Sequence, residues 1–139
     1  MARNVLFGDK WDFTLEVVFY RMDRTVKSDK LYLDPKLTLP VLADMAGTNR
    51  TYASRAVCSR FRNFKNYLNG LRVEHLLRDI QDGNCDDMGV CDEDEFANSY
   101  GFRNRRSMDR VLSKETGYTY RKLLMRRKKR AARVKGSSL

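Results

Sequence analysis

A segment that occurs twice constrains the fold of this chain more than any other feature of the sequence. Residues 43–57 read ADMAGTNRTYASRAV, and residues 97–112 read ANSYGFRNRRSMDRVL. In both copies an alanine stands four residues before a glycine, and a polar run containing arginine leads to an apolar pair. Glycine adopts the left-handed conformation without a Cβ penalty, so a short helix can end there and a second helix can begin almost at once. The repeat therefore predicts two helix-turn-helix units.

The spacing of the two copies indicates a small difference between their turns. The interval from Gly47 to Gly101 is shorter by one position than the interval from Arg55 to Arg110. We therefore expect one additional residue in the second turn.

The 3.6-residue periodicity of the apolar positions predicts an all-α fold of about seven helices. Asp12 is the expected N-cap of a first helix that ends near Asp29. We expect the first helix-turn-helix at about 38–61, a linker helix at 64–80, an acidic loop at 81–91, the second helix-turn-helix at 92–116 and a last helix at 119–130. Together they form a domain of residues 34–130, preceded by an N-terminal extension with the first helix, residues 1–33, and followed by a disordered basic tail, residues 131–139.

The charge balance favours a polyanionic partner. The chain has 28 Lys and Arg against 18 Asp and Glu, which gives a net charge of +10 in 139 residues. Eight of the acids and none of the bases lie in residues 79–95, and nine bases lie in residues 121–135. We therefore expect the basic stretch of residues 121–135 to contact phosphates that flank a binding site.

Several other classes of protein are disfavoured. No apolar run approaches the ~20 residues that a membrane span needs, and no secretory signal opens the chain. Three cysteines, an odd number, fit reduced thiols in the cytoplasm better than a disulfide framework. We therefore predict a soluble cytoplasmic protein with no membrane partner.

Nothing in the sequence indicates an enzyme, a metal site or a cofactor. The single histidine, His75, lies on a predicted helix without an evident catalytic partner, and no glycine-rich phosphate loop occurs. Cys58, Cys85 and Cys91 lack CxxC spacing, so a metal site is disfavoured. A thiol switch between Cys85 and Cys91 is disfavoured as well, because the neighbouring carboxylates raise thiol pKa values and slow oxidation.

Three stretches resemble the DNA-binding domain of AraC-type (AraC/XylS) transcription regulators, a bacterial-type family. They are LTLPVLADMAGTNRTYASRAV, NFKNYLNGLR and DEFANSYGFRNRRSMDRVLSKETGYTYRKLL, and the resemblance covers about residues 33–127. It implies two helix-turn-helix units joined by a long helix. It also implies that one chain reads a bipartite site as a monomer, with two recognition helices in successive major grooves about 34 Å apart.

The resemblance also assigns the DNA-contact residues. Thr51, Ser54 and Arg55 stand where the first recognition helix of the family meets base edges, with Arg50 beside them near the backbone. The predicted contact residues of the second unit are Asn104, Arg105, Arg106, Asp109 and Arg110.

The residue types suit base reading, although alternatives remain open. An arginine presents a fork to guanine O6 and N7, yet it can instead contact phosphate or remain a solvated charge. Asp109 either accepts from cytosine N4 or holds a neighbouring arginine in place, and we favour the second use because an unpaired carboxylate is repelled by DNA. For Arg72 in the linker helix we favour a structural ion pair, whereas Tyr52 and Ser107 suit either packing or a phosphate hydrogen bond.

The resemblance implies a sequence-specific regulator of transcription, and it favours an activator that contacts RNA polymerase. Two other functions are compatible with the sequence: a non-specific basic protein that binds DNA or RNA, and a helix-turn-helix module that binds another protein. Only residues 1–33 precede the matched region, which leaves no room for an effector domain. We therefore expect either a stand-alone regulator, which the initial Met favours, or the output part of a longer one.

Overall fold

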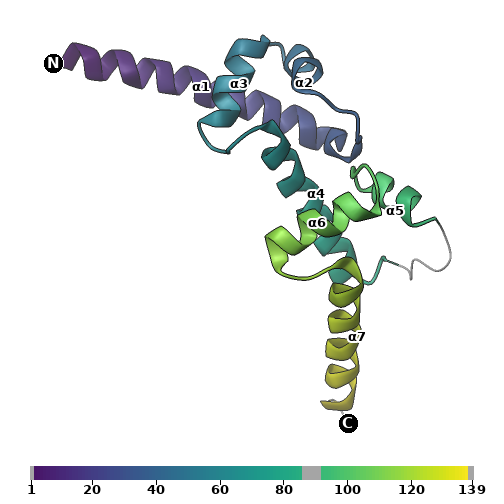
Figure 1. The fold of residues 1–139 in the computed structure, drawn as a ribbon. Coiled ribbons are helices and arrows are strands. Elements are labelled where there is room, and N and C mark those ends of the chain that lie inside the picture. The colour runs from purple at the N-terminus through teal and green to yellow at the C-terminus, as the bar shows by residue number, and fades with distance from the viewer. Residues whose placement is uncertain (1, 86–91, 138–139) are drawn as a thin grey trace. The chain divides into compact units, whose positions relative to one another are not determined.

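The computed structural model is all-helical over the residues that it describes, 2–85 and 92–137 (Figure 1). These residues form seven α-helices and one short 3-10 turn, and no strand occurs among them. Side chains are described for residues 14–85 and 92–131. The predicted all-α fold of about seven helices is confirmed.

The order of the helices follows the sequence pattern. The elements are α1 (Ala2–Ser28), η1 (Leu31–Leu33), α2 (Leu39–Met45), α3 (Arg50–Cys58), α4 (Phe64–Gln81), α5 (Glu93–Ser99), α6 (Arg105–Thr116) and α7 (Tyr120–Ser137). Pro40 lies in the first turn of α2, where its missing N–H costs no hydrogen bond. Residues 86–91 of the expected acidic loop lie outside the described residues.

Three helix boundaries differ from the expected ones. α1 begins at Ala2, so Asp12 is an interior residue and does not cap the helix. α3 ends at Cys58, one turn before the expected end at Phe61. α7 continues to Ser137, through most of the tail for which the sequence suggests disorder.

Helix propensity accounts for the longer terminal helices. The segment before Asp12 has no proline and a single glycine, Gly8, which weakens a helix by about 1 kcal/mol without ending it. Residues 131–135 read AARVK, in which Ala, Arg and Lys are strong helix formers. Neither segment contains a stop signal, so each helix extends.

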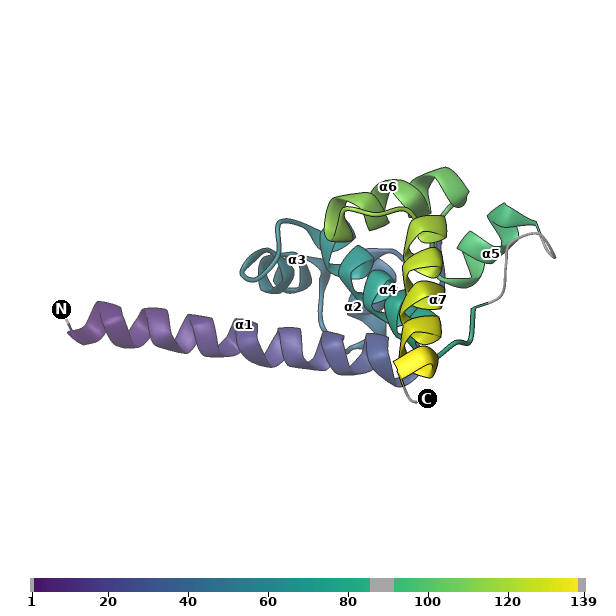
Figure 2. The ribbon, with the colours of Figure 1, turned by 90° about the horizontal axis from the view of Figure 1, so that it is seen from below.

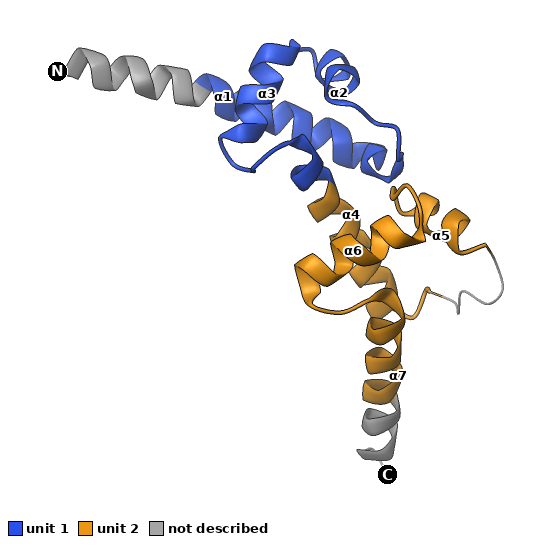
Figure 3. Ribbon diagram, in the orientation of Figure 1, with its two compact units in different colours: residues 1–68 blue, residues 69–139 orange. Residues whose placement is uncertain are grey.

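The chain divides into two compact units inside α4 (Figure 3). Unit 1 is Met1–Leu68 and unit 2 is Asn69–Leu139. The expected domain start near residue 34 falls within unit 1. α1 is part of this unit and packs against α2 and α3.

The core of unit 1 forms where α1 meets α3, and the two helices lie side by side in Figures 1 and 2. α1 contributes a stripe of inward residues at helical spacing, Val18, Met22 and Val26. Facing helices contribute Leu42, Ala43, Ala53, Ala56 and Val57. The two buried alanines of α3 are small, which permits close approach of the helices.

An aromatic group covers one side of this core. Phe61 and Tyr67 lie with ring centroids 5.1 Å apart, and Phe19 of α1 contacts both. The Tyr67 hydroxyl donates to Asp23 over 2.6 Å. Burial, followed by this bond to a carboxylate, raises the pKa of Tyr67 far above its ordinary value.

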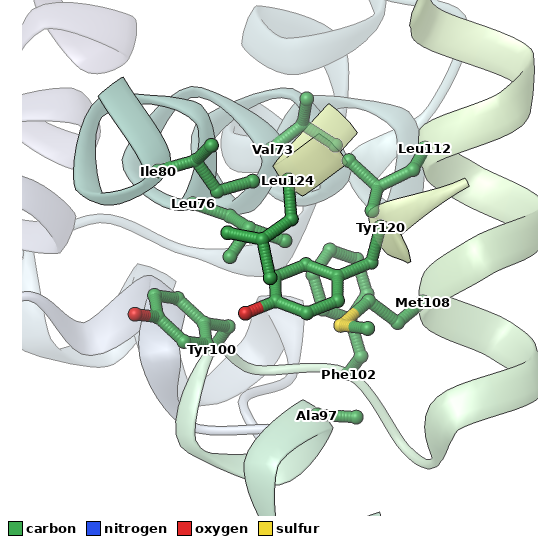
Figure 4. Packing of buried hydrophobic residues seen from close by; sticks show 10 residues of the cluster. All are labelled: Val73, Leu76, Ile80, Ala97, Tyr100, Phe102, Met108, Leu112, Tyr120 and Leu124. Carbon is green, nitrogen blue, oxygen red and sulfur yellow. The ribbon is translucent and has the colours of Figure 1, made fainter. Parts of the chain in front are cut away.

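The core of unit 2 gathers side chains from four helices and one turn (Figure 4). It consists of Val73, Leu76 and Ile80 of α4, Ala97 of α5, Tyr100 and Phe102 of the turn, Met108 and Leu112 of α6, and Tyr120 and Leu124 of α7. Because the turn contributes two of these residues, the α5–α6 junction is part of the core.

Candidate nucleic-acid interface

In the first repeat, backbone hydrogen bonds end α2 and an asparagine cap begins α3. Gly47 has φ +75°, and the next amide, that of Thr48, donates to the Ala43 carbonyl over 2.9 Å. This bond and the left-handed glycine together form a Schellman-type helix end. The Asn49 side chain then accepts from the Tyr52 amide over 2.9 Å and caps α3. The helix–turn–helix of α2 and α3 is thus fixed by local bonds.

The second repeat has the same geometry with a longer turn. Gly101 has φ +90°, and the Phe102 amide donates to the Ala97 carbonyl over 3.0 Å. The Asn104 side chain accepts from the Ser107 amide over 2.8 Å and caps α6. The additional residue predicted from the spacing is Arg103, between the glycine end and the asparagine cap. The repeat in the sequence is therefore a repeat of backbone structure.

The outer face of α3 carries the residues expected to contact DNA. Arg50, Thr51 and Arg55 are exposed, and Ser54 is half-buried. The opposite face is the buried one, with Ala53, Ala56 and Val57. α3 therefore anchors its apolar face in unit 1 and presents a polar, positively charged face to solvent.

The expected contact residues of α6 fall into two groups. Arg106 and Arg110 are exposed, and no ion pair joins either of them to a described residue. Arg105 and Asp109 are only 20% and 22% exposed at their side chains. Asn104 uses its side-chain oxygen for the cap of α6.

Arg105 is held by carboxylates on both sides. Its Nε donates to Asp109 Oδ2 over 2.7 Å, and its Nη1 lies 2.9 Å from Glu93 Oε1 at the start of α5. Burial by itself lowers the pKa of Arg105, but the hydrogen bonds and charges of these two acids raise it above its ordinary value. The side chain is thus a fixed cation within unit 2.

Asp109 has two partners inside the unit. Besides Arg105, it accepts from the backbone amide of Tyr120 over 2.9 Å, at the first residue of α7. Of the two roles weighed for Asp109, holding a neighbouring arginine is the one seen here. The i,i+4 spacing of Arg105 and Asp109 is the sequence signal for their ion pair. No such local spacing indicates Glu93, Asp94 or the Tyr120 amide, which lie on other elements and which the sequence does not predict as partners of this pair.

A basic helix follows the second repeat. The expected start of the last helix at residue 119 agrees with the structure, where Thr119 Oγ1 accepts from the Lys122 amide over 3.3 Å and caps α7. The guanidinium of Arg126 lies over the Tyr118 ring, 4.5 Å from its centroid. Further along α7, Lys128, Lys129 and Arg130 are exposed and extend the positive charge.

Arg72, His75 and Cys85, which the sequence analysis also considers, are buried or lie beside other side chains of unit 2. Arg72 is buried, with 7% exposure, which agrees with the structural role favoured for it. His75 Nε2 lies 3.7 Å from Asp79 Oδ2, and Cys85 Sγ lies 3.6 Å from the Tyr100 hydroxyl. Among the described residues no group of three or more potential ligands could hold a metal. Cys91 lies outside them.

Comparisons of the chain with protein-family models, curated proteins and solved structures find no match. Within residues 2–85 and 92–137, no helix has the length and apolar character that crossing a bilayer requires.

Proposed function

We propose that this chain is a sequence-specific double-stranded DNA-binding regulator of transcription that reads a bipartite site with α3 and α6. The observation that carries the proposal is the repeated geometry of a left-handed glycine, an asparagine cap and a helix with exposed arginines. The net charge of +10 supplies attraction for the phosphate backbone. The sequence resemblance, which includes both copies of the repeat, points to the same function.

Arg55 and Arg110 are the proposed base readers. Each lies six residues after the asparagine cap of its helix, and each is exposed. Both side chains therefore lie at the same place on their recognition helices, and each can present its guanidinium fork to guanine O6 and N7. Thr51 adds a hydroxyl group, which can form a hydrogen bond to a base, and a methyl group, which can contact a thymine methyl.

Arg50 and Arg106 are the proposed companions of these base readers. Both lie in the first turn of a recognition helix and are exposed. Contacts from this turn to phosphate fix the register of a helix on DNA without specifying a base. In each unit, one arginine thus contacts phosphate and fixes the position of the helix, and another reads a base.

Activation by contact with RNA polymerase is the regulatory role that the resemblance favours. Its test is transcription in vitro from a promoter that carries the selected site. Increased transcription with added protein supports the activator, and decreased transcription makes the protein a repressor.

Selection from a random duplex library at about 150 mM salt tests the function directly. Two enriched motifs support the two-headed reader, and their separation measures the spacing of the half-sites. Enrichment of one motif restricts base reading to one unit. Binding without enrichment identifies a non-specific basic protein, and a folded protein without DNA binding identifies a protein-interaction module.

Single-arginine variants then assign each motif to its helix. Arg55→Ala should weaken preference within one half-site and Arg110→Ala within the other. Arg78→Gln is a matched control, because Arg78 is exposed on α4, pairs with Glu74 over 2.9 Å and lies outside both helix–turn–helix segments. Equal losses with all three variants would indicate general charge attraction and contradict base reading.

A further inference from the structure

The first arginine of each recognition helix has a different environment in the two repeats. Arg50 and Arg105 are both the residue after the asparagine cap. Arg50 is exposed, and no ion pair joins it to a residue that the structure describes. Arg105 has a side chain only 20% exposed and engages Glu93 and Asp109. Equivalent positions in the repeat therefore carry arginines in different states.

The acids around Arg105 have no counterparts in the first repeat. Alignment of the two repeats at their glycines, Gly47 and Gly101, fixes which positions of α2 and α5 correspond. Leu39 then stands opposite Glu93, and Pro40 stands opposite Asp94. Glu93 and Asp94 of unit 2 are thus absent from the equivalent positions of the first repeat.

The third acid follows the same pattern. Alignment of the two recognition helices at their caps, Asn49 and Asn104, places Ser54 opposite Asp109. Three acids thus surround one arginine in unit 2, where the equivalent positions of unit 1 carry none.

These acids connect three helices of unit 2. Asp94 Oδ1 accepts from the Arg105 backbone amide over 2.9 Å, which joins α5 to the start of α6. Asp109 joins α6 to the start of α7 through the Tyr120 amide, also over 2.9 Å. The Arg105 side chain lies between Asp109 and Glu93 of α5. The recognition helix is therefore fastened to both of its neighbours at its N-terminal half.

We propose that Arg105 and Asp109 are positioning residues that set the orientation of α6 within unit 2, and that the arginine contacts of α6 with DNA fall to Arg106 and Arg110. To reach DNA, the Arg105 side chain would have to give up two charge-assisted hydrogen bonds, which are among the stronger ones in proteins. The carboxylates beside it would also repel phosphate. The inference rests on the proposed function, because it divides the residues of that interface by role.

The salt dependence of binding separates the two roles. Binding weakens as salt rises, and loss of one phosphate contact lowers the magnitude of the slope of log K against log salt by about 0.9. Arg50→Gln and Arg106→Gln should each produce a decrease of this size on the selected duplex. Arg105→Gln should leave the slope unchanged while it lowers affinity. Because all three variants remove one positive charge, they are matched to one another.

Base preference provides a readout that general destabilisation does not change. Asp109→Asn retains an oxygen that can accept from the Tyr120 amide but replaces the oxygen that accepts from Arg105 with an amide donor. We expect this variant to broaden preference over all positions of the second half-site. Preference at the first half-site should be unchanged. Arg110→Ala, by contrast, should broaden preference at one position.

Thermal unfolding tests the pair without DNA, so failure of the proposed function can be distinguished from failure of this inference. Arg105→Gln and Asp109→Asn should each lower Tm by about 3–5 °C, and the double variant should lower it by less than the sum. Asp109→Ala should lower Tm further than Asp109→Asn, because it also removes the bond to the Tyr120 amide.

Two results would overturn the assignment. One is a slope that falls by about 0.9 in Arg105→Gln, which would make Arg105 a phosphate contact. The other is additive Tm changes for Arg105→Gln and Asp109→Asn, which would show that the two side chains act independently. Absence of selective DNA binding by the unaltered protein would reject the proposed function alone, since non-additive Tm changes would still show that Arg105 and Asp109 act together to fix α6 within unit 2.

Discussion

Replacement of Gly47 by alanine tests the reasoning about the turns with the smallest possible change. Gly47 has φ +75°, and a Cβ added there would meet nothing within 4 Å. The substitution therefore introduces backbone strain without a steric clash. Gly70 is the matched control, because a Cβ there also meets nothing within 4 Å, whereas its backbone is that of the α4 helix.

The two substitutions should change stability in opposite directions. A non-glycine residue in the left-handed conformation costs about 1–2 kcal/mol, and alanine recovers about 0.4–1 kcal/mol by restricting the unfolded chain. At the centre of these ranges, Gly47→Ala should therefore lower the free energy of unfolding by about 0.8 kcal/mol. Gly70→Ala should raise it by about 0.5–1 kcal/mol, because glycine is unfavourable within a helix.

Urea unfolding followed by circular dichroism measures both effects. The midpoint should shift while the m-value stays constant, since neither change alters the surface exposed on unfolding. Gly47→Asn should cost less than Gly47→Ala, because asparagine tolerates the left-handed conformation better. If Gly47→Ala were neutral or stabilising, the left-handed turn would not be a constraint on α2 and α3, and the structural basis of the repeat would be refuted.

Three further predictions concern the interface and the buried hydroxyls. Arg55→Ala or Arg110→Ala should each cost about 1–3 kcal/mol on the selected duplex, measured by fluorescence anisotropy, and equal losses on random DNA would instead indicate phosphate contacts. Neutralising residues 128–130 with glutamine should lower the salt slope by about 0.9 for each lost phosphate contact, and an unchanged slope would remove α7 from the interface. Burial, and the hydrogen bonds that the Tyr67 and Tyr100 hydroxyls donate to Asp23 and Asp79, raise the pKa values of both hydroxyls above the ordinary 10.0, so the folded state keeps protons that the unfolded chain loses. Their contribution to stability is therefore present below pH 10 and declines above it. An ultraviolet titration of the folded protein at pH 12 should detect ionisation of fewer than its seven tyrosines. Ionisation of all seven without unfolding would contradict the buried hydrogen bonds.

Local signals predicted the repeated turns well, because the bonds that form them are local. The glycine ends at Gly47 and Gly101 and the helix starts after Asn49 and Asn104 follow from residues within a few positions. The difference in spacing also located the additional residue of the second turn. Backbone conformation at such positions depends on side-chain type, so the sequence suffices.

Helix ends and packing partners were harder to predict. The first helix-turn-helix is expected from residue 38, and Thr38 is indeed the N-cap of α2, yet its side chain makes no capping hydrogen bond. The inclusion of α1 in unit 1 depends on contacts with α2 and α3, which no local pattern encodes. Periodicity predicts that α1 has an apolar face, with Val18, Met22 and Val26, but it does not specify which helix covers that face.

The roles of the arginines in α6 show where residue type alone is insufficient. Arg105, Arg106 and Arg110 have the same chemistry, and each could be assigned to DNA from the sequence. Their functions depend on what lies beside each guanidinium: Arg105 has a carboxylate on either side, whereas Arg106 and Arg110 are exposed. A positive helix face therefore contains both residues available for a partner and residues that hold the helix in place. Burial and ion pairing, rather than charge, separate them, and for that reason the salt slope of Arg105→Gln is the decisive measurement on this face.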